Sequence, residues 1–403
     1  MKLNVRAPGN MFLGYGAASI NIMKALDKLG VEISYFQIGQ PQLTTNDTAL
    51  LQKWINNQNT FDSSAPALTI WHENQLSERI GNGKHYALSF FELDTLNERR
   101  RHHLNSVNHL ITPSAWALDV LRKNNVTTPA SVVPMGVDTE IFHPFDVNRS
   151  DKYTFLVMGK WELRKGHDLI HEIFNNAFSV DDDVELWMMC SNIFLNEEET
   201  REWENYYLQT DLGQAGKIKF IAQVKTDYEL AQIMNQVDCG ISLSKAEGFD
   251  LPILKMMACG KKVITTNYSA HTEFCNNDNS YLIDIDELEE ANDGGKWFGP
   301  GTGNEGNWAK IGESQQEQAI EHLRNNMYDH IRPNYVIRTA AEVGGVGGYV
   351  YKNNKINQAG LETAQNMTWE ICGQKIKDLI FSCPPKPEPP TIVIIRDDQT
   401  SVR

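Results

Sequence analysis

The sequence has few cysteines, no long apolar run and no excess of positive charge, and each shortage excludes a class of protein. Its six cysteines are scattered, with no C-x-x-C pair and none at zinc-ligand spacing beside a histidine. No apolar run approaches the roughly 18 residues of a spanning helix, and the opening MKLNVRAPGNMFLGYG lacks the apolar stretch of a secretory signal. We therefore expect a cytoplasmic protein with reduced, mostly buried thiols.

The charge and composition limit the partners and the number of domains. A formal net charge of −15 argues against nucleic acid as a partner, because proteins that bind phosphate backbones usually have a basic face. Hydrophobic residues make up 41% and charged residues 22% of the chain, as in an ordinary globular protein. At ~150 residues per domain, 403 residues predict two or three domains.

Short apolar runs alternate with helical patterns, which predicts a mostly parallel sheet covered by helices. In the N-terminal part we expect strands at 3–7, 33–38, 68–71, 86–91 and 110–112. After a linker at 134–152 the pattern restarts, with strands expected at 153–158, 184–190, 217–221, 237–243, 262–265 and 281–283. Two α/β halves joined by a linker place a cleft at the carboxyl ends of both sheets.

Helix signals and glycine or proline clusters complete this outline. One helix has apolar residues at 18, 22, 25 and 29 and ends at Gly30, and Ser114 is a good N-cap for another. Capping boxes are expected at 95–98, 226–229 and 314–317, and a last helical pattern covers 358–381. Residues 293–308 are read as a long flexible loop, 344–348 as an inserted hairpin or turn, and the proline-rich tail from 384 as extended.

Gly14-Tyr15-Gly16 opens the first expected helix. A glycine turn at a helix N-terminus presents backbone N–H groups to an anion, so this position suits a phosphate. The dinucleotide fingerprint needs a third glycine where Ser19 stands, and a tighter turn than the stretch from Ala7 to Gly14 allows. Taken alone, the motif favours phosphate binding and a simple helix-entry turn equally.

Three cations follow the first strand of the second half, in the segment Gly159-Lys160-Trp-Glu-Leu-Arg164-Lys165-Gly166. A cluster of this kind at the carboxyl end of a strand can hold a diphosphate. Charge runs are more often solvated loops, but the position at a strand end favours a functional interpretation.

A second polar loop contains Glu247 and precedes a short helix whose first turn has Pro252 and whose end is marked by Gly260. The backbone amides around Phe249, Asp250 and Leu251 are then expected to point into the cleft. A carboxylate at Glu247 can accept hydrogen bonds from sugar hydroxyls, and a structural alternative is that it binds nearby loop amides.

The segment Ala246-Glu247-Gly-Phe-Asp-Leu-Pro-Ile-Leu-Lys-Met-Met-Ala-Cys-Gly resembles the donor-site motif of retaining, GT-B-fold glycosyltransferases of the GT4-type group. The same group is resembled by Pro134-x-Gly-Val-Asp-x-x-x-Phe-x-Pro144, by the Lys160–Lys165 segment and by Thr368-Trp-Glu370. The resemblance covers roughly 1–290 and 356–381. It implies an α/β fold of GT-B type, with two Rossmann-like domains facing each other across a cleft.

The resemblance also implies roles for individual residues. Lys160, where the family usually has arginine, and Lys165 would clamp the donor diphosphate, and Glu247 would contact the transferred sugar. The family's second glutamate, which holds the donor ribose, falls on Lys255 here. An ammonium cannot accept hydroxyl protons, and a cation in the first turn of a helix opposes the dipole. Either Lys255 reaches a phosphate, or the nucleotide site is altered or impaired.

Other polar and aromatic residues are secondary candidates for the cleft. Glu92, in a segment that resembles the acceptor side of a subset of these enzymes, ends a strand and is preferred over Asp94, which has a structural role available before a capping box. The pair His72-Glu73 is more readily explained as buried or solvated. The aromatic residues Trp297, Phe298 and Trp308 could stack on a sugar face, and packing of their loop on the domain is at least as good an explanation. The basic run 99–103 is read as a helix surface, with peripheral membrane or acceptor contact less favoured.

These observations predict a domain at 1–145 on the acceptor side, a donor domain at 146–365, a helix at 366–383 packing back on the first domain, and a tail at 384–403. The expected function is transfer of a sugar, with retention, from a nucleoside-diphosphate sugar to a glycan, lipid, protein or small molecule. No metal or other cofactor is expected, because Lys160, Lys165 and the Gly14–Gly16 amides would neutralise the leaving diphosphate. The alternative is an impaired transferase that binds sugar or nucleotide. A nicotinamide oxidoreductase would need the missing glycine fingerprint.

Overall fold

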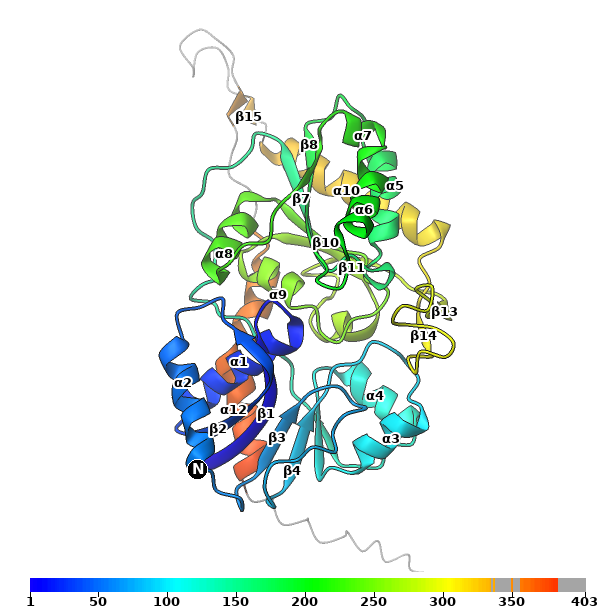
Figure 1. Cartoon of the computed structure of the whole chain (residues 1–403). Helices are drawn as coiled ribbons and strands as arrows, with labels where there is room; N and C mark the ends of the chain where they lie inside the picture. Colours follow the sequence, from blue (N-terminus) through cyan, green and yellow to red (C-terminus); the bar gives the residue numbers. More distant parts are fainter. Residues whose placement is uncertain (335, 338–348, 351–355, 383–403) are drawn as a thin grey trace, which may run out of the picture.

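The computed structural model describes residues 1–334, 336–337, 349–350 and 356–382, with side chains up to Tyr328 and again from Ile356. The expected hairpin at 344–348 and the proline-rich tail from 384 lie outside the described residues. Within them the chain forms two α/β domains, stacked one above the other in Figure 1. Along the described parts of the chain, no helix has the length and apolar character needed to cross a membrane.

The N-terminal domain contains a six-stranded parallel sheet in the order β2-β1-β3-β4-β5-β6. Its strands are β1 (Lys2–Asn10), β2 (Glu32–Gln42), β3 (Ala67–Ile70), β4 (His85–Leu88), β5 (His109–Thr112) and β6 (Ala130–Val132). Around it lie α1 (Gly14–Lys28), α2 (Thr48–Asn56), the short η1 (Asn57–Thr60), α3 (Glu98–Asn105) and α4 (Ala115–Lys123). Strand β3 is buried along its whole length, as expected when helices cover both faces of a sheet.

The C-terminal domain repeats this architecture, with a parallel sheet in the order β12-β11-β10-β7-β8-β9. Its strands are β7 (Tyr153–Gly159), β8 (Val184–Cys190), β9 (Ile218–Phe220), β10 (Cys239–Ser242), β11 (Lys262–Thr266) and β12 (Tyr281–Ile283). Its helices are η2 (Leu163–Lys165), α5 (His167–Ala177), α6 (Glu197–Leu208), α7 (Asp211–Gln214), α8 (Asp227–Gln236), α9 (Leu251–Ala258), η3 (Ser269–Glu273), α10 (Glu313–Asn334) and α11 (Gln358–Gln365). The two matching sheets confirm the predicted pair of Rossmann-like domains.

The last helix, α12 (Trp369–Phe381), returns from the second domain and lies against α1 of the first (Figure 1). The contact is close, because a Cβ on Gly373 would lie 2.5 Å from the Cβ of Ala25. Lys377 donates from Nζ to the carbonyl of Leu29 at 3.0 Å, near the end of α1. The linker is joined to the start of α12 by a bridge between Val137 and Thr368.

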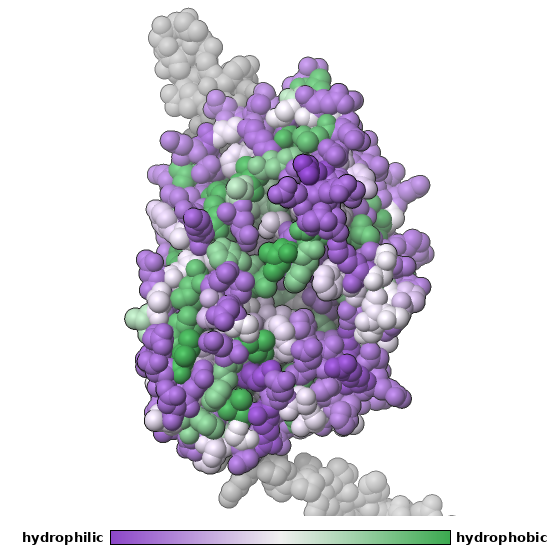
Figure 2. All heavy atoms as spheres, viewed as in Figure 1, coloured by the Kyte–Doolittle hydropathy of each residue, from purple (hydrophilic) through white to green (hydrophobic). Residues whose placement is uncertain are grey.

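The domains also meet through α4 and η3. The backbone N–H of Ala115, at the start of α4, donates to Oε2 of Glu273 at 2.7 Å. Beside it the rings of Trp116 and Tyr268 have centroids 5.8 Å apart. Together with α12, these contacts hold the two sheets so that their carboxyl ends face a shared cleft, where the surface recedes between the domains in Figure 2.

Several local expectations are confirmed. Ser114 caps α4 by accepting from the N–H of Ala117 at 3.1 Å, and Thr226 with Glu229 forms a capping box on α8. Gly260 has a φ of 69° just after α9, as a glycine that ends a helix should.

Other helix expectations are wrong. Asn97, not Thr95, caps α3, and α10 begins at Glu313, so Ser314 lies in the first turn instead of at the N-cap. The pattern at 358–381 is two helices, since α11 ends at Gln365 and Thr368 caps α12.

The glycine-rich stretch after β12 is more ordered than the expected flexible loop. Strands β13 (Leu288–Glu290) and β14 (Asn307–Ala309) pair antiparallel. Trp308, which is 1% exposed, packs with Leu93 of the first domain. Two-residue strands at β15 (Val336–Ile337) and β16 (Tyr349–Val350) also pair. The glycine count concealed the strand at 307–309, because glycines before it dominate the local composition.

Candidate active site

Glu247 lies at the centre of a charged cluster in the loop between β10 and α9. Its Oε1 accepts a hydrogen bond from Oγ of Ser244 at 2.6 Å and another from Nζ of Lys165, and it lies 3.3 Å from Nη1 of Arg164. The backbone N–H of Glu247 donates to Oγ of Ser269 at 2.8 Å. All three side-chain contacts are to Oε1, so the carboxylate is held in one orientation by two cations and a hydroxyl.

Arg164 and Lys165 come from η2, immediately after β7. Gly166 allows this turn, because its φ is 69° and a Cβ there would lie 2.2 Å from the carbonyl of Leu243. Nη1 of Arg164 also donates to the carbonyl of Ala246 at 2.6 Å, which ties η2 to the Glu247 loop. Burial opposes the charge of Arg164, but neighbouring carboxylates, Glu247 first, hold its pKa above the ordinary value. The pKa of Lys165 is raised in the same way, so both cations stay protonated.

Lys160 is the most exposed of the three predicted phosphate ligands. It follows the last residue of β7, its side chain is 40% exposed, and Nζ lies 3.3 Å from Oε1 of Glu162. The ammonium also lies 5.7 Å from the centre of the Phe194 ring. All three cations are paired with carboxylates, but Arg164 and Lys165 are buried, whereas Lys160 lies partly exposed at the edge of the cluster.

Glu92 approaches this cluster from the other domain, on the loop after β4. Burial raises the pKa of its carboxyl above the ordinary value, against the opposing field of Arg164, and Glu247 raises it further. The two carboxylates are therefore close enough to interact across the cleft. The loops that contain them touch, since a Cβ on Gly248 would lie 2.8 Å from the Cβ of Phe90.

Helix α1 begins at Gly14, close beside the same loops. Strand β1 runs to Asn10, so the connection is only 11–13 and the expectation of a long loop from Ala7 is wrong. Gly16 allows this tight turn, because a Cβ there would lie 1.9 Å from the carbonyl of Asn10. The first N–H groups of an α-helix have no partner within the helix, so those of Gly14, Tyr15 and Gly16 are suited to an anion.

The Tyr15 side chain has a role that the sequence did not suggest. Its hydroxyl donates to the carbonyl of Phe90 and accepts from the N–H of Phe90, both at 2.9 Å. The two rings pack edge to face with centroids 4.9 Å apart. Tyr15 therefore fixes the loop that contains Glu92. The exposed His72 lies beside Tyr15, with 4.8 Å between the centroids of their rings.

Helix α9 begins in the cleft after an unusual residue. Asp250 has a φ of 73°, rare for a residue with a side chain, and its Oδ2 accepts from Oγ of Ser242 at 2.6 Å and contacts Nε2 of His271 at 2.8 Å. Burial raises the pKa of Asp250, but Lys165 and the His271 bond lower it more, to a value below the ordinary one. The Asp250 side chain thus anchors α9 instead of facing a ligand.

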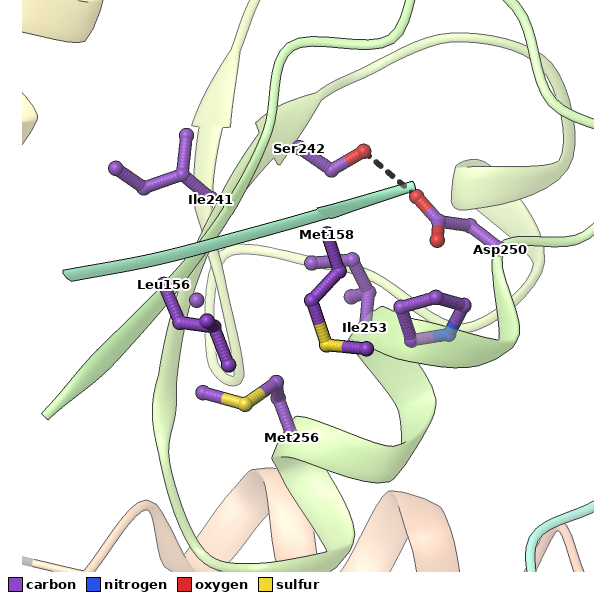
Figure 3. Close-up of a pocket in the computed structure, with 9 residues that line it drawn as sticks. Leu156, Met158, Ile241, Ser242, Asp250, Ile253 and Met256 are labelled. Atoms are coloured by element: carbon purple, nitrogen blue, oxygen red, sulfur yellow. Dashed lines mark hydrogen bonds between the residues drawn. The ribbon is translucent and has the colours of Figure 1, made fainter. Parts of the chain in front are cut away.

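Figure 3 shows the start of α9 beside the ends of β7 and β10. The apolar gap there, between Met158, Ile253 and Met256, holds only about 10 Å³, room for about one water. Phe249 is 3% exposed and packs on Phe274. The Phe249 side chain is therefore part of the core, which leaves the backbone of the 249–251 segment as its possible contribution to a ligand.

Lys255 does not join the Lys160–Lys165 cluster. It lies in the last turn of the two-turn α9, not in the first turn as expected, and there its charge suits the helix dipole. Its Nζ lies 3.4 Å from Oδ1 of Asp227 on α8 and 4.5 Å from the centre of the Phe142 ring in the linker. Lys255 is thus paired with a carboxylate and an aromatic face.

The secondary candidates have mostly structural contacts. Glu73 forms a buried ion pair with Arg100 at 2.9 Å, which also places one residue of the basic run inside the domain. Oδ1 of Asp94 accepts from the N–H of Asn307 at 2.7 Å and so joins the first domain to β14. Trp297 is 38% exposed at the edge of the second domain.

Sequence reasoning missed Ser244, Ser269 and His271. Ser244 and Ser269 form hydrogen bonds with Glu247, and His271 contacts Asp250. Ser244 lies in the β10–α9 loop and the other two lie in η3, and no sequence motif predicts these contacts. The hydroxyl residues would have been found only by asking what satisfies a buried carboxylate. Among the described residues no group of three or more His, Cys, Asp or Glu side chains could hold a metal ion.

Comparison with known proteins supports the fold and one domain's family. Residues 152–293 match the family described as "Glycosyl transferases group 1". A curated relative, the MMP alpha-(1->4)-mannosyltransferase of Mycolicibacterium hassiacum, is 27% identical over 185 residues, which cover 44% of this chain and 43% of that protein. The chain thus matches less than half the length of this relative.

Solved structures match over nearly the whole chain. Sucrose-phosphate synthase from Thermosynechococcus elongatus is 14% identical, with a TM-score of 0.64 over 94% of this chain and 98% of that one. Anabaena HepE in complex with UDP and glucose is 14% identical, with a TM-score of 0.59 over 95% and 99% of the two chains. At such low identity these likenesses show the fold. The solved structures show a GT-B fold, and residues 152–293 are similar to the group 1 glycosyl transferases.

Proposed function

We propose that this protein transfers a sugar from a nucleoside-diphosphate sugar to an acceptor with retention of anomeric configuration. The observation that supports it most is the buried cluster in which Arg164 and Lys165 hold Glu247 at the carboxyl edge of the second sheet, opposite Glu92. Cations for a diphosphate and a fixed acceptor for sugar hydroxyls lie in one place. The structural likeness to Anabaena HepE, whose structures are in complex with UDP and glucose or with UDP-glucose, supports the donor class.

In this proposal the donor diphosphate lies between Lys160 and the N-terminus of α1, over Arg164 and Lys165. These charges stabilise the negative charge that grows on the leaving nucleoside diphosphate. Oε2 of Glu247 accepts from a hydroxyl of the transferred sugar, since its Oε1 is already engaged. The acceptor hydroxyl attacks the anomeric carbon from the face that the phosphate leaves. The bond from that carbon to the phosphate oxygen breaks, and the hydroxyl proton passes to this oxygen.

The test is donor turnover by the purified protein. A panel of UDP-, GDP- and ADP-sugars is incubated with and without simple acceptors, and release of the nucleoside diphosphate is measured. Lys160→Ala should lower kcat/KM by about 100-fold if its ammonium stabilises the leaving group. Lys152→Ala is a matched control, because that lysine is equally exposed but lies at the opposite end of β7. Turnover that survives Lys160→Ala would contradict the phosphate clamp.

The pairing of Lys255 favours a second candidate, a transferase-like protein that binds nucleotide or sugar without turnover. Nζ of Lys255 is held by Asp227 and Phe142, so it does not replace the hydroxyl acceptor that the donor ribose requires. Calorimetry with UDP and UDP-sugars distinguishes the two functions, because binding without product release supports the binding protein.

Back-substitution at Lys255 needs a control for charge. Lys255→Glu would place a carboxylate beside Asp227, a repulsion that Lys255→Gln avoids. Higher activity in Lys255→Glu than in Lys255→Gln would show that the wild-type site is impaired. If both variants lose activity, the lysine is an adaptation of a working site.

A further inference from the structure

A second pocket lies beside the candidate active site, between α6, the start of η2 and the glycine-rich loop. It encloses about 380 Å³, within the range of small-molecule sites. Its walls include four aromatic residues and five carboxylates against one lysine: Trp161, Trp203, Tyr206, Trp297, Glu162, Asp168, Glu199, Glu202, Asp293 and Lys296. The lysine is already paired, with Nζ 2.7 Å from Oε1 of Glu199. The pocket is thus aromatic and acidic, and of its carboxylates Glu199 is paired with this lysine and Glu162 with Lys160 and Arg164.

Two buried polar atoms of residues that line this pocket have no hydrogen-bond partner among the described residues. Trp161 is 2% exposed and lines the pocket, yet its indole Nε1–H donates to nothing. Oδ1 of Asp168 is also buried without a hydrogen bond. Both atoms are almost inaccessible to solvent, so a ligand in the pocket reaches them only when the side chains that cover them move.

The requirements of these atoms select the chemistry of the ligand. The indole N–H needs an acceptor, whereas Asp168 and Glu202 need donors. A sugar hydroxyl is both a donor and an acceptor, while a simple cation satisfies only the carboxylates and an anion only the indole. Ring faces such as the exposed one of Trp297 also pack well against the apolar faces of sugar rings.

The pocket adjoins the active-site cluster through one shared residue. Glu162 lines the pocket, and its carboxylate pairs with Arg164 at 3.0 Å and with Lys160 at 3.3 Å. Glu162 therefore lies between the active-site cations and the pocket. A chain bound in the pocket can extend past Glu162 toward the transfer site.

We propose that this pocket binds a neutral saccharide chain, the distal part of a glycan acceptor. The proposal rests on the proposed function for the acceptor role, but the binding itself does not require turnover. Trp297 and Trp203 form the walls against which sugar rings pack, and Glu202, Asp168 and Trp161 bond their hydroxyls.

The test measures saccharide binding directly by calorimetry on the full chain. Probes are neutral hexasaccharides of glucose, mannose, galactose and N-acetylglucosamine, with hexagalacturonate as an anion and spermidine as a cation. We expect at least one neutral hexasaccharide to bind and hexagalacturonate not to bind. Trp297→Ala and Glu202→Gln should each weaken binding by about tenfold. Both residues are exposed, so the variants should fold.

Tyr228→Ala is the matched control, since this tyrosine is 60% exposed on α8 and does not line the pocket. Binding of spermidine alone, lost in Glu202→Gln, would overturn the proposal in favour of a cation site. Lack of saturable binding by every neutral hexasaccharide would also overturn it. Stabilisation by UDP, measured in the same samples, reports the donor site separately. Absence of UDP binding would contradict the proposed function, but it would not affect the result for saccharide binding.

Discussion

Glu247→Gln removes one negative charge from a buried cluster while keeping nearly the same volume. The wild-type carboxylate, 7% exposed, is bonded by Ser244 and Lys165 and pairs with Arg164 at 3.3 Å. Breaking a buried ion pair costs about 3–5 kcal/mol. The amide oxygen can still accept from Ser244 and Lys165, so we expect a loss of about 2–4 kcal/mol in unfolding free energy.

The expected loss of activity is larger than stability alone would produce. If Glu247 accepts a hydrogen bond from a sugar hydroxyl in the transition state, kcat of the variant should fall by about 100-fold or more at a temperature where it remains folded. Thermal denaturation gives the change in stability, and donor turnover gives the change in kcat. Binding of UDP, followed by calorimetry, should persist because Lys160 and both buried cations remain.

Glu185→Gln is the matched control for this change. Glu185 is also a buried glutamate between two lysines, Lys152 and Lys219, at 3.4 Å and 2.7 Å. Glu185 lies at the start of β8, at the amino ends of the strands and away from the cleft. Its two lysine partners are well exposed. We expect a smaller destabilisation, about 1 kcal/mol, and unchanged kcat. Equal turnover in Glu247→Gln and Glu185→Gln would refute the assignment of Glu247.

Three further predictions concern the first domain. Burial and neighbouring carboxylates raise the pKa of Glu92, so its ionisation destabilises the fold as pH rises above the ordinary glutamate pKa. Glu92→Gln should therefore be more stable than wild type at neutral pH in thermal denaturation. Equal stability of the two proteins at that pH would contradict this prediction. Gly16→Ala should lose at least about 2 kcal/mol against the Asn10 carbonyl, whereas Gly14→Ala, with open space around it, should be neutral in urea unfolding. Tyr15→Phe should cost about 1–2 kcal/mol and lower kcat more than it changes donor KM, while a purely structural role would leave kcat unaltered.

The fold was predictable because each buried strand leaves a short apolar run, and parallel sheets bury both faces of their strands. Strand β6 was missed, since its three residues, Ala130–Val132, are only half-buried at the edge of the sheet and give no apolar run. The cap of α3 was misplaced for a different reason. Thr95 and Asn97 are both good N-caps, and only the tertiary position of the chain decides between them.

Only those residues of the candidate site that lie in sequence motifs could be predicted. The motifs named Lys160, Lys165 and Glu247 as candidates, but they could not show that Arg164 and Lys165 are both paired with Glu247. The motifs also could not show that Lys255 pairs with Asp227 on α8, because this contact depends on how two helices pack. Motifs define which residues are available, whereas burial and partners decide which charges are left for a ligand.

The contacts between the two domains explain how the candidate residues can act together. Tyr15 binds both backbone groups of Phe90, the Phe90 side chain packs on Gly248, and Gly248 adjoins Glu247. A continuous path of contacts therefore runs from the N-terminus of α1 through the Glu92 loop to the charged cluster. Each contact is a close approach or a pair of hydrogen bonds, so the N-terminus of α1 and the loops that contain the two glutamates are held against one another.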